Sequence, residues 1–208
     1  MSQKYASYHI RTDEKSDVFA ELKNIIVNEN ANTNAMLAMQ AFSDPEARKM
    51  AERFYNLSQN DIYIVLTEKF ISVYDETFSF QTINGTAKKV SKKIIKPIVY
   101  VSNFDDDVFL AGVVKCGKTY AKKQIGQGMH IFGIKSINDI RKIHNFEEFG
   151  YLKPDLIFEL SDDICECEDS IEKELGITLK LTPEDIQEQS DQFVLLETES
   201  QFKVYQTK

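Results

Sequence analysis

Cysteine and histidine are scarce in this sequence, and their positions exclude the frameworks usually built from them. Three cysteines in 208 residues are few and odd in number, which does not suit a disulfide scaffold. Cys165 and Cys167 have no second ligand pair in the chain, so we predict no zinc site. His9, His130 and His144 are scattered, and we expect each to be structural. The sequence therefore predicts neither a disulfide scaffold nor a metal centre.

Long apolar runs are also absent. A helix that crosses a bilayer needs about 20 consecutive apolar residues, and no run in this chain approaches that length. The N-terminal segment, MSQKYASYH, contains no apolar signal-peptide core. We therefore expect a cytoplasmic protein with no membrane partner.

Recognisable catalytic motifs are missing as well. The chain has no serine-nucleophile elbow. Acidic residues are so numerous that no pair can be singled out as an acid–base couple. The sequence thus implies no cofactor and favours a role other than catalysis. An enzyme whose pocket residues converge only in three dimensions stays an open alternative.

Charge is unevenly distributed along the chain. The formal net charge is −8, which disfavours nucleic acid as a partner. Residues 147–208 contain 17 acidic residues and 5 lysines, a net charge of −12, whereas residues 85–124 contain nine lysines and three aspartates, a net charge of +6. These segments are either two solvated surfaces or an acidic face that meets a basic partner. We expect Glu166, Glu168 and Asp169 to lie on that acidic face.

The clearest structural pattern lies in residues 62–121. Two short runs, at 62–66 and 70–74, are rich in β-branched and aromatic residues and predict a hairpin. The next segment carries one apolar residue per helical turn, with lysines on its opposite side, and predicts a helix packed on a sheet. Its apolar residues are Ile83, Ala87, Val90 and Ile94.

Two further apolar runs complete this stretch. Residues 97–101 and 108–114 are apolar at successive positions, as in strands covered on both faces. Residues 118–121 then return as an edge strand after a turn at Gly117. The order predicts an α+β fold with a mixed or antiparallel central sheet, built on a ββαββ unit with helices before and after it.

Residues 70–120 resemble a module found in uncharacterised bacterial proteins. The residues that carry the resemblance are Val73-Tyr74-Asp75, Val90-Ser91, Pro97-Ile98-Val99, Asp105, Asp107 and Gly117. The resemblance implies a bacterial protein with a hairpin turn at Gly117, and it brings no activity with it.

One motif in this stretch matches a nucleotide-binding pattern. Residues 112–119, GVVKCGKT, fit the phosphate loop G-x-x-x-x-G-K-[ST], so Gly112, Gly117, Lys118 and Thr119 are candidate cofactor-binding residues. A phosphate loop opens onto a helix N-terminus, but only a few residues separate Thr119 from the next glycines. The stiff valines within the motif favour a strand. We therefore prefer the hairpin and keep nucleotide binding as the alternative.

The flanking regions are predicted to be mainly helical. Before the central stretch we expect helices at 16–26, 35–42 and 45–57, with polar residues 28–34 ending the first of them. After it we expect a strand at 129–132, helices at 136–146, 161–176 and from 182, and a hairpin spanning 193–205. Residues 1–130 would form the core domain, and residues 131–208 an acidic, helix-rich extension packed on it as one unit.

Two functions of different class follow from these patterns. We predict a non-catalytic module that binds another protein through its acidic C-terminal third. The alternative is a nucleotide-binding protein that uses residues 112–119.

Overall fold

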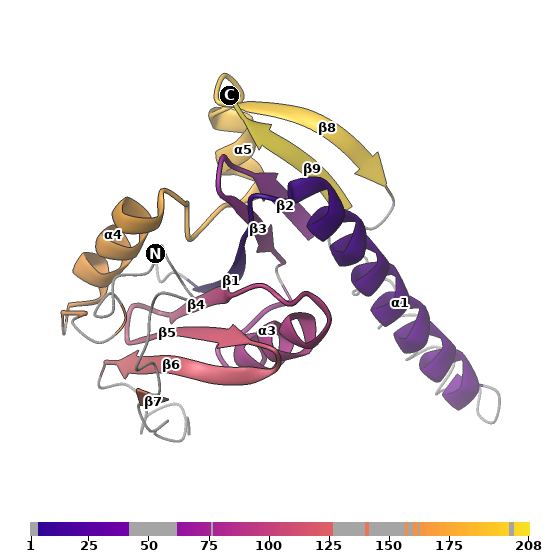
Figure 1. The fold of residues 1–208 in the computed structure, drawn as a ribbon, viewed down its shortest axis with the longest axis horizontal. Coiled ribbons are helices and arrows are strands. Elements are labelled where there is room, and N and C mark those ends of the chain that lie inside the picture. The colour runs from indigo at the N-terminus through magenta and orange to yellow at the C-terminus, as the bar shows by residue number, and fades with distance from the viewer. Residues whose placement is uncertain are drawn as a thin grey trace.

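The computed structural model of this chain is organised around one mixed sheet of nine strands (Figure 1). It describes residues 4–41, 62–75, 77–126, 140–141, 157, 160–161, 163–199 and 202–208. The elements in chain order are β1 (Lys4–Arg11), α1 (Lys15–Ala41), β2 (Ile62–Leu66), β3 (Phe70–Tyr74), α3 (Ile83–Lys93), β4 (Ile98–Phe104), β5 (Val108–Lys115), β6 (Lys118–Ile125), β7 (Ile140–Arg141), α4 (Ile164–Leu175), α5 (Pro183–Glu188), β8 (Phe193–Glu199) and β9 (Phe202–Thr207).

The first strand lies at the centre of the sheet. The strand order is β7-β6-β5-β4-β1-β3-β2-β9-β8, so β1 separates the β2–β3 hairpin from the β4–β5 hairpin. The described strands pair antiparallel except β2 and β9, which run parallel. The α+β class and the mixed sheet agree with the prediction. The four strands expected to form one ββαββ unit are divided by β1.

One face of the sheet is covered by α1 and α3. The apolar stripe of α3 is buried as the helical spacing predicts, and its members are Ile83, Ala87, Val90 and Ile94. From α1, Val18, Leu22, Ile25 and Ile26 join the same core. We call this the first face. The apolar side chains of the two helices and of the strands form one continuous cluster on this face, as expected when the apolar side of each helix packs on the apolar side of a sheet.

The opposite, second face is covered by the C-terminal third of the chain. Helix α4 buries Cys167, Ile171 and Leu175 against one end of this face, and α5 buries Ile186 against the other. Gly176 ends α4 in the left-handed conformation, with φ 64°, which glycine adopts without steric cost. Thr182 and Asp185 form a capping box that starts α5. Between the two helices, residues 177–181 cross the sheet without regular structure, and we call this segment the strap.

Three sequence predictions need correction. Residues 28–34 do not end the first helix, because α1 continues to Ala41. This segment contains no proline or glycine, and other residues lower helix propensity by at most about 0.7 kcal/mol each. Residues 118–121 are not an edge strand, since β7 pairs with β6 on its outer side. Residues 140–141 form that strand instead of part of a helix.

Some predictions fall outside the described part of the chain. These are the helix at 45–57, the strand at 129–132 and the remainder of the helix at 136–146. Strands from both predicted segments, 1–130 and 131–208, belong to the same sheet. In the described residues, no helix is both long and apolar enough to span a membrane.

Candidate functional site

The phosphate-loop-like motif forms the β5–β6 hairpin. Cys116 and Gly117 make the two-residue turn with φ values of 50° and 73°, and Lys115 pairs with Lys118 across it. Positive φ at both central residues is the mark of the tight turn that matches strand twist. The strand β6 begins at Lys118, where a phosphate loop would open onto a helix.

The remaining motif residues have roles within the sheet. Gly112 lies under the ring of Tyr100, and a Cβ atom there would sit 2.4 Å from the tyrosine hydroxyl oxygen. Glycine is thus required by close packing at this position. Thr119 is buried in β6, whereas Lys118 is exposed. The four candidate residues therefore do not surround a common nest of backbone N–H groups.

A buried polar cluster on the second face brings a serine and a histidine together. Ser7 and His9 lie two positions apart on β1, and both are fully buried. The Ser7 hydroxyl donates to the Leu179 carbonyl in the strap at 2.7 Å. The His9 ring contacts Ser7 Oγ through Nε2 at 3.1 Å and Ser72 Oγ through Nδ1 at 2.8 Å. Burial lowers the pKa of His9 to about 3.

The directions of these hydrogen bonds oppose a nucleophilic role. A serine hydroxyl has one proton, and Ser7 gives it to the strap carbonyl. His9 Nε2 must therefore donate to Ser7, while Nδ1 accepts from Ser72. A serine nucleophile needs the reverse, with histidine accepting the hydroxyl proton. The cluster ties the strap to the sheet, which fits the structural role expected for His9.

One of the acidic residues of α4, Glu168, makes hydrogen bonds inside the molecule. Glu168 accepts hydrogen bonds from the Tyr5 hydroxyl at 2.6 Å and from the Asn103 amide at 2.7 Å. Burial and the Glu168 carboxylate raise the pKa of Tyr5 well above its usual value. Glu168 was expected to lie on a free acidic face, and this expectation is wrong, because its carboxylate is hydrogen-bonded to Tyr5 and Asn103. Glu166 and Asp169 are exposed, as expected.

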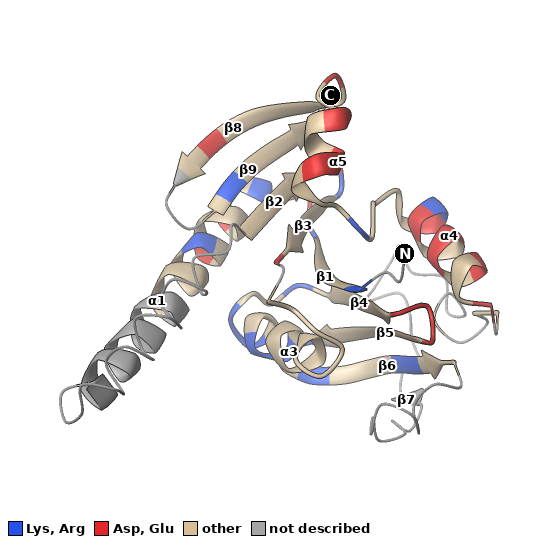
Figure 2. Ribbon diagram, turned by 180° about the vertical axis from the view of Figure 1, so that it is seen from behind, with Lys and Arg blue, Asp and Glu red and all other residues tan. Residues whose placement is uncertain are grey.

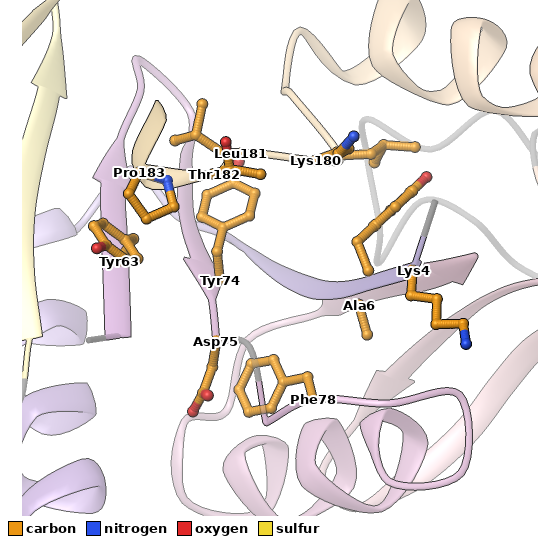
Figure 3. Close-up of a pocket in the computed structure, with 12 residues that line it drawn as sticks. Lys4, Ala6, Tyr63, Tyr74, Asp75, Phe78, Lys180, Leu181, Thr182 and Pro183 are labelled. Carbon is orange, nitrogen blue, oxygen red and sulfur yellow. The ribbon is translucent and has the colours of Figure 1, made fainter. Parts of the chain in front are cut away.

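A small cleft opens where β3 ends at Tyr74. Figure 3 shows Asp75 and Phe78 on one side of it and the segment 181–183 on the other. The Asp75 carboxylate accepts from the amide and the hydroxyl of Thr77 at 2.7 and 2.6 Å. Burial raises the pKa of Asp75, although these hydrogen bonds oppose the shift. The cleft holds about 100 Å³, below the roughly 300–1,000 Å³ of small-molecule sites.

A second pocket lies on the first face between α1 and α3. It holds about 280 Å³ and is lined mainly by apolar side chains, including Ile25, Ile62, Phe78 and Val90. The carboxylate that reaches it is again Asp75, which is already hydrogen-bonded to Thr77. Three threonines, Thr77, Thr82 and Thr86, also line it. The hydroxyls of Thr77 and Thr82 are hydrogen-bonded to Asp75 and Ser79 within the chain, so they are already used inside the protein.

The largest of these openings lies at the outer end of the second face. We call it the outer groove; it holds about 380 Å³ between α5 and β8. It is lined by Tyr63, Pro183, Ile186, Gln187, Ser190, Phe193, Leu195, Lys203 and Tyr205. The rings of Tyr63 and Tyr205 stack with centroids 6.4 Å apart, and Phe193 meets Tyr205 edge-on at the same distance. Aromatic surfaces of this kind dominate the energetics of protein interfaces.

The strand beside the outer groove exposes apolar side chains. Val194, Leu195 and Leu196 of β8 are 43%, 55% and 51% exposed. Leu195 is the one of these three that lines the groove. Val194 pairs with Gln206, so its side chain lies on the opposite face of the sheet. An exposed apolar side chain next to a groove lined by aromatic rings is typical of an interaction site. The sequence predicted this hairpin, but it did not show that these side chains lie uncovered.

Acidic side chains border the outer groove. Residues 184–199 contain six acidic residues and no lysine or arginine. Figure 2 shows acidic residues in red on α5 and β8. Of these, Glu197 is paired with Lys23 of α1, whereas Glu184, Glu188 and Asp191 are exposed. Among the described residues, Lys203 is the one charged residue that lines the groove itself, so three exposed acidic residues near the groove stand against one lysine within it.

Comparisons with known proteins add no assignment to this geometry. No protein-family model, curated protein or solved structure matches the chain. The argument for function therefore depends on the residues of the site.

Proposed function

We propose that this chain is a non-catalytic protein-binding module and that the outer groove with β8 is its binding surface. The observation that carries the proposal is the exposed Leu195 side chain, which lines a groove rich in aromatic rings. The same surface lies in the acidic C-terminal third, where the sequence predicted a protein partner. We retain a bacterial, cytoplasmic origin as a prediction.

The energetics favour covering this surface. Full burial of a valine or leucine side chain is worth about 1.5–3 kcal/mol. Because the Leu195 side chain is about half exposed, a partner that covered it would gain roughly 1 kcal/mol. The ring faces in the groove add further apolar area. Such a central patch with a charged border has the anatomy of a protein interface.

A pair of matched variants tests the proposal. Leu195→Asp places a charge in the outer groove, while Ile95→Asp places one at an apolar residue that is 69% exposed and does not line the groove. Tagged versions of wild type and both variants would be used to capture partners from lysate of the source organism, followed by quantitative mass spectrometry.

The expected result is a partner retained by wild type and Ile95→Asp and lost by Leu195→Asp. All three chains should have similar melting temperatures, because both sites are exposed. Capture should weaken as salt rises, since the border charges are screened. Equal capture by Leu195→Asp and Ile95→Asp would contradict the proposed surface.

A further inference from the structure

The strand β8 lies at one edge of the sheet, and no described strand lies on its outer side. In the described residues, β8 pairs with β9 alone, and it ends the strand order. A terminal strand carries N–H and C=O groups that a strand from another chain can pair with. The neighbouring outer groove could receive alternate side chains of that strand, because its lining includes Phe193 and Leu195 of β8 itself.

The same strand carries features that restrict which strands could pair with it. The register shifts between Leu195 and Glu197, so Leu196 is an extra residue in a β-bulge. Bulges and charges near an edge oppose unselective pairing with other strands. An added strand would therefore be short, and it would have to tolerate the acidic border.

Charge complementarity then selects the occupant. Among the described residues near the groove, Glu184, Glu188 and Asp191 are exposed, against one lining lysine, Lys203. A second copy of this chain would bring the same acidic set and a further net charge of −8. A segment flanked by lysine or arginine would meet opposite charge, which favours association and disfavours wrong partners.

We propose that the partner segment is a short extended peptide with alternating apolar residues and basic ends, which adds as a strand to β8. This inference rests on the proposed protein-binding role of the outer groove. Backbone hydrogen bonds to β8 would supply affinity, and apolar side chains in the groove would supply specificity.

The probe is a synthetic peptide with the sequence KKVTVTVKK, blocked at both ends. A second peptide has the same sequence with N-methyl groups at alternate backbone positions of its central segment, on the edge that would face β8. A third replaces the lysines by glutamates. Binding to the full chain would be measured by titration with NMR detection of the backbone amides, and again with Leu195→Asp and Ile95→Asp.

The lysine-flanked peptide should bind, shift the amide signals of β8, and bind Ile95→Asp equally well. The N-methylated peptide should bind about tenfold more weakly, because it lacks two or more hydrogen-bond donors. The glutamate-flanked peptide and Leu195→Asp should give still weaker binding. Affinity should fall with added salt.

Three results would overturn the inference. The first is equal affinity for the N-methylated peptide, and the second is no binding of the lysine-flanked peptide. If either accompanied partner capture that Leu195→Asp abolishes, the protein-binding surface would stand and strand addition would fail. The third is a concentration-dependent dimer, seen by light scattering and lost in Leu195→Asp, which would make a second copy the occupant.

Discussion

The two ends of the second face differ in how completely they are covered. At the α4 end, a helix of 12 residues buries Cys167, Ile171 and Leu175 against the sheet. At the α5 end, a helix of six residues buries Ile186 alone. At 1.5 Å per residue, the helices are about 18 and 9 Å long, whereas the four strands from β3 to β8 span about 14 Å at their usual spacing.

The shorter helix lies at the end of the face that holds the outer groove. Ile186 of α5 and Leu181 of the strap pack on Tyr63, Val65 and Tyr74. The outer groove between α5 and β8 stays open. The two apolar clusters of this face meet at β1, where His9 is paired with Ser72 on one side and Val99 on the other. The comparison predicts that the α4 end stabilises the fold and that the outer groove serves binding.

The largest contrast should come from truncating one apolar side chain at each end. Ile171→Ala removes a fully buried side chain at the α4 end and should cost about 2–5 kcal/mol of unfolding free energy. Leu195→Ala, at the exposed end, should change it by less than about 0.5 kcal/mol. Urea denaturation of both variants would measure the difference. Similar losses would break the comparison.

Acid should weaken the junction between the two ends. The folded-state pKa of His9, about 3, lies below the usual value of about 6.5. A lowered histidine pKa stabilises the fold at high pH, and that stability is lost as pH falls from about 6.5 towards about 3. Between pH 7 and 5, protonation linked to His9 should lower the unfolding free energy by about 2 kcal/mol.

A histidine variant isolates this contribution from those of the carboxyl groups. His9→Gln cannot titrate in this range, so its unfolding free energy should fall less than that of wild type between pH 7 and 5. Urea denaturation at both pH values would measure the two slopes. Equal slopes would contradict the buried neutral state of His9.

A charge reversal should separate the structural from the exposed acids of α4. Glu168→Lys removes the acceptor shared by Tyr5 and Asn103 and should cost about 1–3 kcal/mol. Asp169→Lys, on the exposed side of the same helix, should stay within about 0.5 kcal/mol of wild type. The melting temperatures of the two variants would show which change destabilises the fold more. The account of the α4 end would be wrong if Asp169→Lys were the more damaging change.

The smallest effect is expected at the β5–β6 turn. Because Lys118 is exposed and begins a strand, Lys118→Ala should be within about 0.5 kcal/mol of wild type. ATP with magnesium should leave the melting temperature unchanged. A nucleotide site at a hundred times its dissociation constant would add about 2.7 kcal/mol. A thermal shift with ATP that disappears in Lys118→Ala would favour the nucleotide alternative.

Local patterns were enough to predict much of this fold. The helical spacing of Ile83, Ala87, Val90 and Ile94 identified the buried stripe of α3. The Thr182 and Gly176 signals identified the start of α5 and the end of α4. These features depend on neighbours within a few positions, so one sequence contains the necessary information.

Long-range pairing could not be predicted in the same way. Nothing local places β1 between β3 and β4 or sets β9 parallel to β2. Ser7 and His9 alternate visibly along β1, but the strap carbonyl that accepts from Ser7 lies 172 positions later in the chain. The outer groove was missed for the same reason, since its lining combines β2, α5, β8 and β9.

Site-specific photocrosslinking in cells tests the central claim most directly. A photoreactive phenylalanine analogue would replace Leu195 in one version of the chain and Ile95 in another. The account predicts that the version labelled in the outer groove forms a covalent adduct with a second protein and that the version labelled at the exposed Ile95 does not. Absence of an adduct at Leu195, or equal adducts at both positions, would contradict it.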